Sequence, residues 1–402
     1  MRGFQPCISV KKNVILQLRS SIVINIYNTM NYMKKVFLIL VVGSLLSCGE
    51  QPKELPAFPD NLPSFDLSDA SQFKQSFVMS IDSMFSKVEE IRLDTENAPL
   101  IGRVLRIFET SNAFFVYDKT LHAFDKNGKY IRKVGSEGRG PGEYLSVHAF
   151  AELSGGAGLL VFDHFGQKFL RYAADGKFLE EYSVRKMDNS FVTKAFFMAR
   201  HTPVLYRDNN SLQMDLLAFD WDIKNSTVLS ESERKMGAEA IVDCVFPFGF
   251  PDQPYVYSYY SGAVYTVKDK QLIPAFSINT GQHTLAVTDM KDPMSINRPL
   301  TQVYGVVQVG DYIFVQYGGA NLDGGRQISS LGLFNILSGA SCPQIRIEDA
   351  QYKYRSITPN SNLNQGYDPK TLLVVQSADK MKEAGADIAE DANSVIIKYL
   401  LK

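Results

Sequence analysis

The chain has 402 residues, 45% of them hydrophobic, and carries a formal charge of −1 at pH 7. A chain of this length can bury a large core, either as one large domain or as two smaller ones. Its 42 lysine and arginine residues are scattered, whereas binding to a phosphate backbone needs a one-sided basic surface, so we expect no nucleic-acid partner. The 20 tyrosines and 26 phenylalanines suit half-buried strands and favour β-structure.

The N-terminal segment contains a secretion-signal pattern. The run MKKVFLILVVGSLLSC, residues 33–48, has two lysines and then an apolar stretch too short for a membrane-spanning helix of roughly 20 residues. Small and apolar residues before Cys48 resemble the lipobox of bacterial lipoproteins. The resemblance implies that residues 33–47 are a signal peptide and that Cys48 is lipidated. Because residues 1–32 would stand in front of this signal, we expect translation to begin at Met33. The alternative is a short membrane-buried stretch with an incidental cysteine.

The segment that follows Cys48 has the composition of a linker. Residues 48–75 are rich in proline and acidic residues and show no hydrophobic period, which predicts an extended, solvated tether. Several lipid chains on one cysteine anchor a protein firmly. We therefore expect the folded domain, residues 76–402, to be attached to a membrane as an outer-membrane lipoprotein that faces either the periplasm or the outside.

Two cysteines lie within the expected domain. Cys244 and Cys342 fall in different repeats, and we expect two separate buried thiols, with a disulfide between them as the alternative for an exported protein. The sequence contains no C-x-x-C pair and no zinc-ligand spacing.

Beyond about residue 86 the sequence repeats itself. The segments that begin at Phe114 and Leu159 each contain an apolar strand ending in aspartate, an aromatic strand, a turn pair and a third strand. The turn pairs, which suit tight hairpins, are Asn127-Gly128 and Asp175-Gly176. Weaker copies begin near residues 202, 254, 311 and 371. A four-stranded unit repeated roughly every 40 to 60 residues is typical of a propeller blade, so we expect an all-β, six-bladed β-propeller of four-stranded blades; five or seven blades stay open.

A propeller ring must close, and both ends of the expected domain supply a strand. Residues 87–95, KVEEIRLDT, precede the first full repeat, and residues 393–402, NSVIIKYLLK, end the chain. Pairing between these N- and C-terminal strands in the last blade would join the ends and remove an exposed sheet edge.

These residues resemble a known family. KVEEIRLDTENAPLIGRVLRI, the block FDKNGKYIRKVGSEGRGPGEY and the terminal SVIIKYLLK are similar to the six-bladed β-propeller lipoproteins of Bacteroidetes, relatives of the NHL-repeat propellers. The resemblance covers residues 76–402 and is strongest over the first two blades. It implies a propeller in the periplasm or at the cell surface and implies no activity, because a fold does not fix a function.

The glycine-rich stretch VGSEGRGPGEY, residues 134–144, is the most specific part of that resemblance. Its glycines form G-x-G-x-G instead of the dinucleotide-binding G-x-G-x-x-G, and a strand follows it where a helix would be needed. We interpret it as the crossover between two blades, with glycine giving the backbone the conformations that a tight path requires. Arg139, Glu143 and Tyr144 lie where a propeller ligand would bind.

Histidines and carboxylates are the candidates for a metal site. His148 and His201 fall in runs that we assign to innermost strands, so both are expected near the central channel. Glu109, Glu152 and Asp243 lie near strand ends, where calcium-dependent propeller enzymes place carboxylates. None of the histidines is paired at metal-ligand spacing, and a satisfied or solvated histidine is the alternative.

The pattern as a whole favours binding over catalysis. The sequence lacks the G-x-S-x-G of serine hydrolases. We expect a lipid-anchored cell-envelope propeller that binds a ligand or a partner, such as an envelope protein, a peptide or a glycan, without catalysis. The expected ligand-face residues are Arg139, Glu143, Tyr144, His148 and His201. The sequence requires no cofactor; the alternative is an NHL-like lyase or hydrolase that uses a divalent cation bound in the channel.

The lipid anchor is tested by Cys48→Ala. Without the thiol no lipid can be attached, so the variant should leave the membrane fraction in a cell fractionation experiment. A variant that still sediments with membranes would contradict the lipoprotein interpretation.

Overall fold

The computed structural model describes residue 59 and residues 61–68, 76–153, 158–184, 191–198, 202–209, 213–219, 226–233, 245–250, 253–258, 262–268, 271–283, 301–320 and 327–402. Contacts divide the chain into residues 1–52 and residues 53–402, and every described residue belongs to the second unit. The predicted start segment, the signal peptide and Cys48 therefore lie outside the described residues. No helix in the described ranges is long and apolar enough to cross a membrane.

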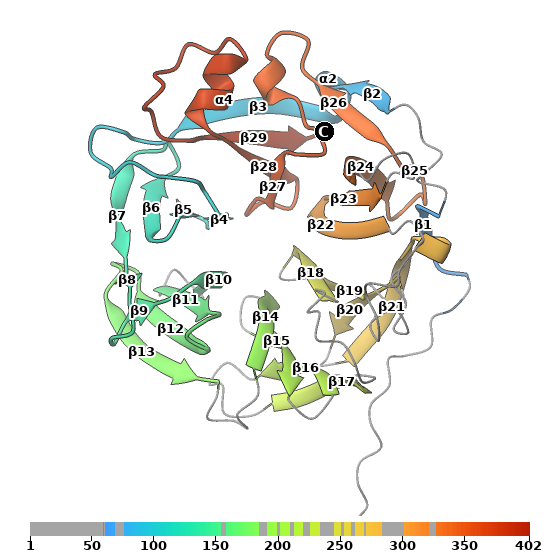
Figure 1. Ribbon diagram of the computed structural model, residues 1–402, viewed down its shortest axis with the longest axis horizontal. Helices are drawn as coiled ribbons and strands as arrows, with labels where there is room; N and C mark the ends of the chain where they lie inside the picture. Colours follow the sequence, from blue (N-terminus) through green and yellow to red (C-terminus); the bar gives the residue numbers. More distant parts are fainter. Residues whose placement is uncertain are drawn as a thin grey trace, which may run out of the picture. The chain divides into compact units, whose positions relative to one another are not determined.

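The described strands form small antiparallel sheets in a propeller arrangement (Figure 1). The first sheet contains β4 (Arg106–Glu109), β5 (Ala113–Tyr117), β6 (Leu121–Asp125) and β7 (Tyr130–Val134). The second contains β10 (Val147–Leu153), β11 (Gly158–Asp163), β12 (Lys168–Ala173) and β13 (Phe178–Ser183). The third contains β14 (Phe191–Met198), β15 (Thr202–Asn209), β16 (Gln213–Phe219) and β17 (Ser226–Glu233).

The C-terminal half continues the pattern. The next sheet contains β18 (Val245–Phe250), β19 (Gln253–Ser258), β20 (Ala263–Lys268) and β21 (Gln271–Asn279), together with β1 (Ser64–Asp66). It is followed by β22 (Thr301–Val309), β23 (Tyr312–Ala320), β24 (Gln327–Asn335) and β25 (Ser341–Cys342). The last contains β27 (Asn362–Gln365), β28 (Thr371–Gln376), β29 (Val395–Leu401) and β3 (Phe85–Arg92).

Short elements lie between the strands of these sheets. They are β2 (Phe77–Ser80), α2 (Ile81–Met84), β8 (Ser136–Glu137), β9 (Glu143–Tyr144), η3 (Gly281–His283), β26 (Ile345–Glu348), η6 (Lys353–Arg355) and α4 (Ala378–Glu383). First strands of different sheets contact each other, namely β10 with β14, β18 with β22, β22 with β27 and β27 with β4. This contact pattern is the one that blades arranged around an axis produce.

The strand count departs from the expectation in one sheet. Six blades of four strands were predicted, and the structure contains five four-stranded blades. The sheet of β18–β21 has five strands, because β1 adds to β21 in parallel, with Ser64 opposite Ser277 and Asp66 opposite Asn279. No sequence pattern indicated this addition, since β1 lies far along the chain from the repeat that it extends.

The two predicted hairpin turns are present. Gly128 has a φ of 85° and Gly176 a φ of 82°, both in the left-handed region that glycine tolerates best. Gly128 also lies against the backbone carbonyl of Arg92, where a side chain would collide. The turn glycines therefore allow each hairpin to pack closely against its neighbour.

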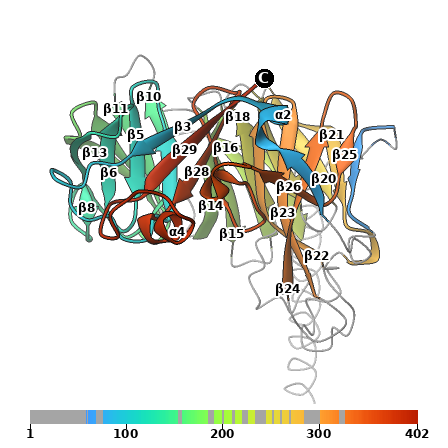
Figure 2. The same ribbon diagram turned by 90° about the horizontal axis from the view of Figure 1, so that it is seen from above.

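The predicted pairing of the chain ends is confirmed. β29 and β3 are antiparallel, with Val395 opposite Arg92 and Leu401 opposite Phe85. Figure 2 shows these two strands side by side along their length. Tyr399, fully buried in this sheet, donates a hydrogen bond to the carbonyl oxygen of Arg355 at 2.7 Å.

The predicted tether, residues 48–75, is wrong for residues 64–67. Phe65 and Leu67, inside the range 48–75, are both fully buried. The ring of Phe65 stacks on that of Phe334 with 5.7 Å between centroids, and it lies where a side chain at Gly332 would otherwise stand. Two apolar residues at alternate positions, Phe65 and Leu67, therefore face the core, although the neighbouring residues of the segment are mostly polar.

The chain before the first full sheet is paired at three places, and we call β1, β2 and β3 the N-terminal belt. After β1, strand β2 pairs in parallel with β26, Phe77 lying opposite Ile345. The helix α2 then leads directly into β3, the outer strand of the last sheet. The belt thus ties the start of the folded unit to three segments of its C-terminal half.

The insertion of Phe65 is tested by Phe65→Ala. Removing a fully buried phenylalanine should lower the free energy of unfolding by about 3–5 kcal/mol, measured by urea denaturation. The control is Phe77→Ala in the next belt strand, whose side chain is 58% exposed and whose loss should change the free energy by less than about 0.5 kcal/mol. Equal effects of the two variants would contradict the packing of β1.

Candidate functional site

The glycine-rich stretch is a crossover between two sheets, as predicted. It leads from β7 to β10, and within it β8 and β9 pair in parallel. Gly142 has a φ of 73°, and a Cβ atom there would lie 2.6 Å from the ring of Phe178. The glycines therefore let the crossover pack directly on the second sheet.

Tyr144 belongs to the core, so its expected place on a ligand face is wrong. The side chain is fully buried. Its hydroxyl donates to the carbonyl oxygen of Val134 and accepts from the amide of Leu121, both at 2.8 Å. Burial raises the pKa of the Tyr144 hydroxyl. A buried tyrosine needs such partners for its hydroxyl, and the sequence did not reveal that they were available.

The two charged residues of the crossover differ in their surroundings. Glu143 is half-buried and accepts a hydrogen bond from the amide of Gly140 at 2.7 Å, so its carboxylate supports its own loop. Arg139 is exposed and forms no salt bridge with a carboxylate of the described residues. The role of both residues as ligand contacts stays a prediction.

The histidines show no convergence on a metal in the described part of the chain. His148 lies in β10, the first strand of its sheet, and is half-buried. Its ring centroid is 5.1 Å from that of His164. His201 and Asp243 lie outside the described residues, as does Cys244, so its pairing with Cys342 is untested. Among the described residues, no group of three or more histidine, cysteine, aspartate or glutamate residues could hold a metal ion.

Glu109 is held by cations of the protein itself. Its side chain is 1% exposed, and Oε1 accepts from Lys126 Nζ at 2.6 Å and Lys398 Nζ at 3.0 Å. Oε2 accepts from the amide of Tyr367 at 2.7 Å. Burial raises the pKa of Glu109, but these hydrogen bonds outweigh it and leave the pKa below its usual value. Glu109 thus joins the first and last sheets. The carboxylate of Glu152 accepts hydrogen bonds from the amide and the hydroxyl of Ser111.

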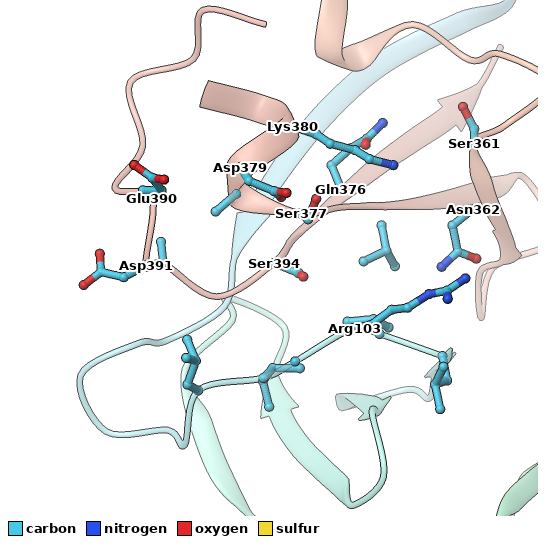
Figure 3. Close-up of a pocket in the computed structure, with 18 of the residues that line it drawn as sticks. Arg103, Ser361, Asn362, Gln376, Ser377, Asp379, Lys380, Glu390, Asp391 and Ser394 are labelled. Atoms are coloured by element: carbon cyan, nitrogen blue, oxygen red, sulfur yellow. The ribbon is translucent and has the colours of Figure 1, made fainter. Parts of the chain in front are cut away.

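A cavity that the sequence did not reveal lies over the junction of the last and first sheets. It has a volume of about 850 Å³, and we call it the seam pocket. Four segments contribute its lining, namely residues 100–105 before β4, residues 358–362 before and into β27, residues 375–380 from β28 into α4, and residues 390–394 before β29. Figure 3 shows the labelled side chains around it.

A buried asparagine fixes the walls of the seam pocket. Asn393, 1% exposed, accepts from the amide of Ile101 at 2.6 Å and donates to the carbonyl of Asp94 at 2.7 Å. The loop before β29 is thereby bound to the crossover before β4. The amide of Gly102 also donates to Asp118 Oδ2 at 3.2 Å, which holds the crossover on the first sheet.

The polar side chains of the seam pocket are unevenly distributed. Arg103 and Lys380 carry positive charge, and Figure 3 places Asn362 at the end toward which both extend. Glu390 and Asp391 lie at the opposite end in the same view. The lining therefore offers a cationic end and an acidic end, and a polar ligand could contact both.

One sequence feature could have pointed to this pocket, namely an unusually long loop near the C-terminus. The segment SADKMKEAGADIAED contains α4, and it lies in an 18-residue connection, residues 377–394, between two strands that pair directly. A blade hairpin is usually much shorter, and long ordered loops are commonly functional. No sequence pattern indicated that this connection lies beside residues 100–105.

The comparisons with known proteins agree with the fold. A family model described as "Domain of unknown function (DUF4934)" matches residues 62–399, a range that includes β1. Among solved structures, a candidate exported protein of Bacteroides fragilis is similar, with 16% identity, a TM-score of 0.57, and coverage of 85% of this chain and 99% of that chain. Its low identity supports the fold alone.

Two further structures show weaker likeness. A member of the DUF4221 family from Bacteroides vulgatus has 9% identity and a TM-score of 0.46, covering 79% of this chain and 97% of that chain. Virginiamycin B lyase from Staphylococcus aureus has 12% identity and a TM-score of 0.40, covering 78% and 99%. Neither likeness carries an argument about function. The comparison with curated proteins gave no match.

The Glu109 cluster predicts a pH dependence of stability. Because the folded-state pKa of Glu109 is lowered, its carboxylate stabilises the fold above the unfolded pKa of about 4.3, and this contribution is lost as the pH falls through the folded pKa. Glu109→Gln should lower the free energy of unfolding by about 3 kcal/mol at pH 7, measured by urea denaturation, since two partly buried lysines lose their partner. The difference from wild type should shrink as the pH falls below 4.

The matched control is Glu89→Gln. Glu89 is 42% exposed and pairs with the exposed Lys87, so this variant should change the free energy of unfolding by less than about 0.5 kcal/mol. A difference between Glu109→Gln and wild type that stays constant from pH 7 to pH 3 would contradict the assigned role.

Proposed function

We propose that this chain, which belongs to the DUF4934 family, is a binding protein of the cell envelope that holds a small polar ligand in the seam pocket without catalysis. The observation that carries the proposal is the pocket itself. Its volume of about 850 Å³ falls within the range of about 300–1,000 Å³ in which small-molecule sites lie. Its walls are fixed by Asn393, so the pocket is largely formed before a ligand arrives.

We further propose that the ring has six blades and is related to the NHL-repeat propellers. The sheet of β18–β21 counts as a blade in this proposal, with β1 as an added outer strand. Support comes from the contact of its first strand, β18, with β22, the first strand of the next sheet.

The proposed location is the outer membrane, on its periplasmic or its outer side, with a lipid anchor on Cys48. Residues 33–47 would be the signal peptide, and residues 48–63 the part of the predicted tether that stays a linker. Support comes from the lysines and the short apolar run before Cys48, and from the similar Bacteroides fragilis structure described as a candidate exported protein. A soluble ligand, or an accessible group of a peptide or glycan, would then reach the pocket from the envelope.

The binding site is tested by Asn360→Trp, which places an indole at the exposed pocket residue Asn360. Full-length protein is titrated calorimetrically with a panel of monosaccharides, sugar acids and dipeptides. Any panel member that binds the wild type should bind this variant at least tenfold more weakly, because the indole occupies part of the cavity.

The control is Ala350→Trp. Ala350 is exposed, lies between β26 and η6 and does not line the pocket, so affinity should be unchanged. Equal affinities of wild type and both variants for every ligand would show that the seam pocket is not the binding site.

A further inference from the structure

Two cationic side chains enter the seam pocket from different walls. Arg103 belongs to the crossover before β4, and Lys380 belongs to α4. Figure 3 shows both extending toward the end of the pocket where Asn362 lies. Both residues are exposed, and neither forms a salt bridge with a carboxylate of the described residues. A guanidinium and an ammonium that share one end of a pocket attract an anion, and a carboxylate can bond both.

The neutral side chains beside these cations suit hydroxyl groups. The amide nitrogen of Gln376 donates to the carbonyl of Tyr354 at 3.2 Å, which leaves the amide oxygen of Gln376 as an acceptor. The amide oxygen of Asn362 accepts from Asn364 at 3.1 Å, which leaves the amide nitrogen of Asn362 as a donor. Further hydroxyls of the lining are those of Ser361, Ser377 and Ser394. Paired donors and acceptors of this kind recognise alcohol groups.

The opposite end of the pocket disfavours a second anionic group. Glu390 and Asp391 lie there, and Asp379 lies on the wall between the two ends (Figure 3). Glu390 is partly neutralised by Lys382, whose Nζ lies 3.0 Å from its carboxylate. The remaining negative charge would repel a dicarboxylate that reached both ends. The charge pattern therefore favours one carboxylate on a ligand that is otherwise neutral.

Apolar side chains complete the lining. Leu100 is 68% exposed and Leu105 50% exposed, and both line the pocket from the crossover. Exposed leucines beside polar groups suit a ligand with an apolar face, such as the carbon–hydrogen face of a sugar ring. The volume of the pocket accommodates a molecule of this size.

We propose that the seam pocket binds a small hydroxylated monocarboxylic acid, with its carboxylate between Arg103 and Lys380. This inference rests on the proposed function, because it names the ligand class of the same pocket. Two sources share the chemistry, a sugar acid in ring form and an open-chain hydroxy acid.

The test is calorimetric titration of full-length protein with D-glucuronate, D-gluconate, D-glucose and the dicarboxylate D-glucarate. Glucuronate or gluconate should bind at least tenfold more tightly than glucose and than glucarate. Preference for glucuronate assigns the site to ring sugar acids, and preference for gluconate assigns it to open-chain acids. Arg103→Gln and Lys380→Gln should each weaken binding of the preferred acid about tenfold, since each removes a charge-assisted hydrogen bond.

The charge control is Lys177→Gln, which removes an exposed lysine between β12 and β13 that does not line the pocket. Its affinity should match the wild type, and thermal melts should confirm that all variants fold. If glucose binds as tightly as both acids, or if Arg103→Gln and Lys380→Gln bind normally, the inference is wrong. Should Asn360→Trp still abolish binding in that case, the pocket remains the site; a lack of effect from Asn360→Trp would overturn both proposals.

Discussion

The pairing of β29 with β3 is the constraint on which the remaining structure depends. It places a strand from the start of the folded unit at the outer edge of the last sheet, where that strand pairs with the edge that β29 would otherwise expose. Contacts outside the ladder reinforce it. Glu90 of β3 binds the guanidinium of Arg355 at 2.7 Å and accepts from the hydroxyl of Tyr354 at 2.8 Å. The chain then crosses from β3 to β4, and the seam pocket is a direct product of that crossing.

Polar residues, and not apolar packing alone, hold the junction between the last and first sheets. Glu109 receives two lysines and one amide, and Asn393 bonds two segments of the crossover. Each is buried with its partners satisfied, which is the condition under which a buried polar group specifies one arrangement of the chain. The seam pocket lies over this junction, and Asn393 attaches the crossover that carries Arg103 to the loop before β29.

Features that repeat along the chain or depend on neighbouring residues could be predicted from the sequence. Features that occur once and join distant segments could not. The hairpins at Gly128 and Gly176 followed from turn chemistry, and ring closure followed from two strands at the domain ends. Strand β1 has three residues in a polar linker and pairs with a segment far along the chain, so no local pattern indicated it. Tyr144 was placed on a ligand face because blade crossovers lie on the face where propeller ligands usually bind, and no local pattern indicated that its hydroxyl has buried partners. The seam pocket is built by four separate segments, and no spacing in the sequence relates them.

The N-terminal belt also has a consequence for the order of folding. The hydroxyl of Ser86 donates a hydrogen bond to the carbonyl oxygen of Leu400, 314 positions further along the chain. Strands β1 and β2 likewise pair with strands that come much later in the sequence, β21 and β26. Contacts of such large sequence separation form late and slow the folding of a domain. During synthesis each belt strand emerges before its partner: β1 has no partner until β21 is made, β2 none until β26 is made, and β3 none until β29 is made at the end of the chain. The pairing that closes the ring therefore forms only after β29 has been made, and until then β3 is an unpaired strand.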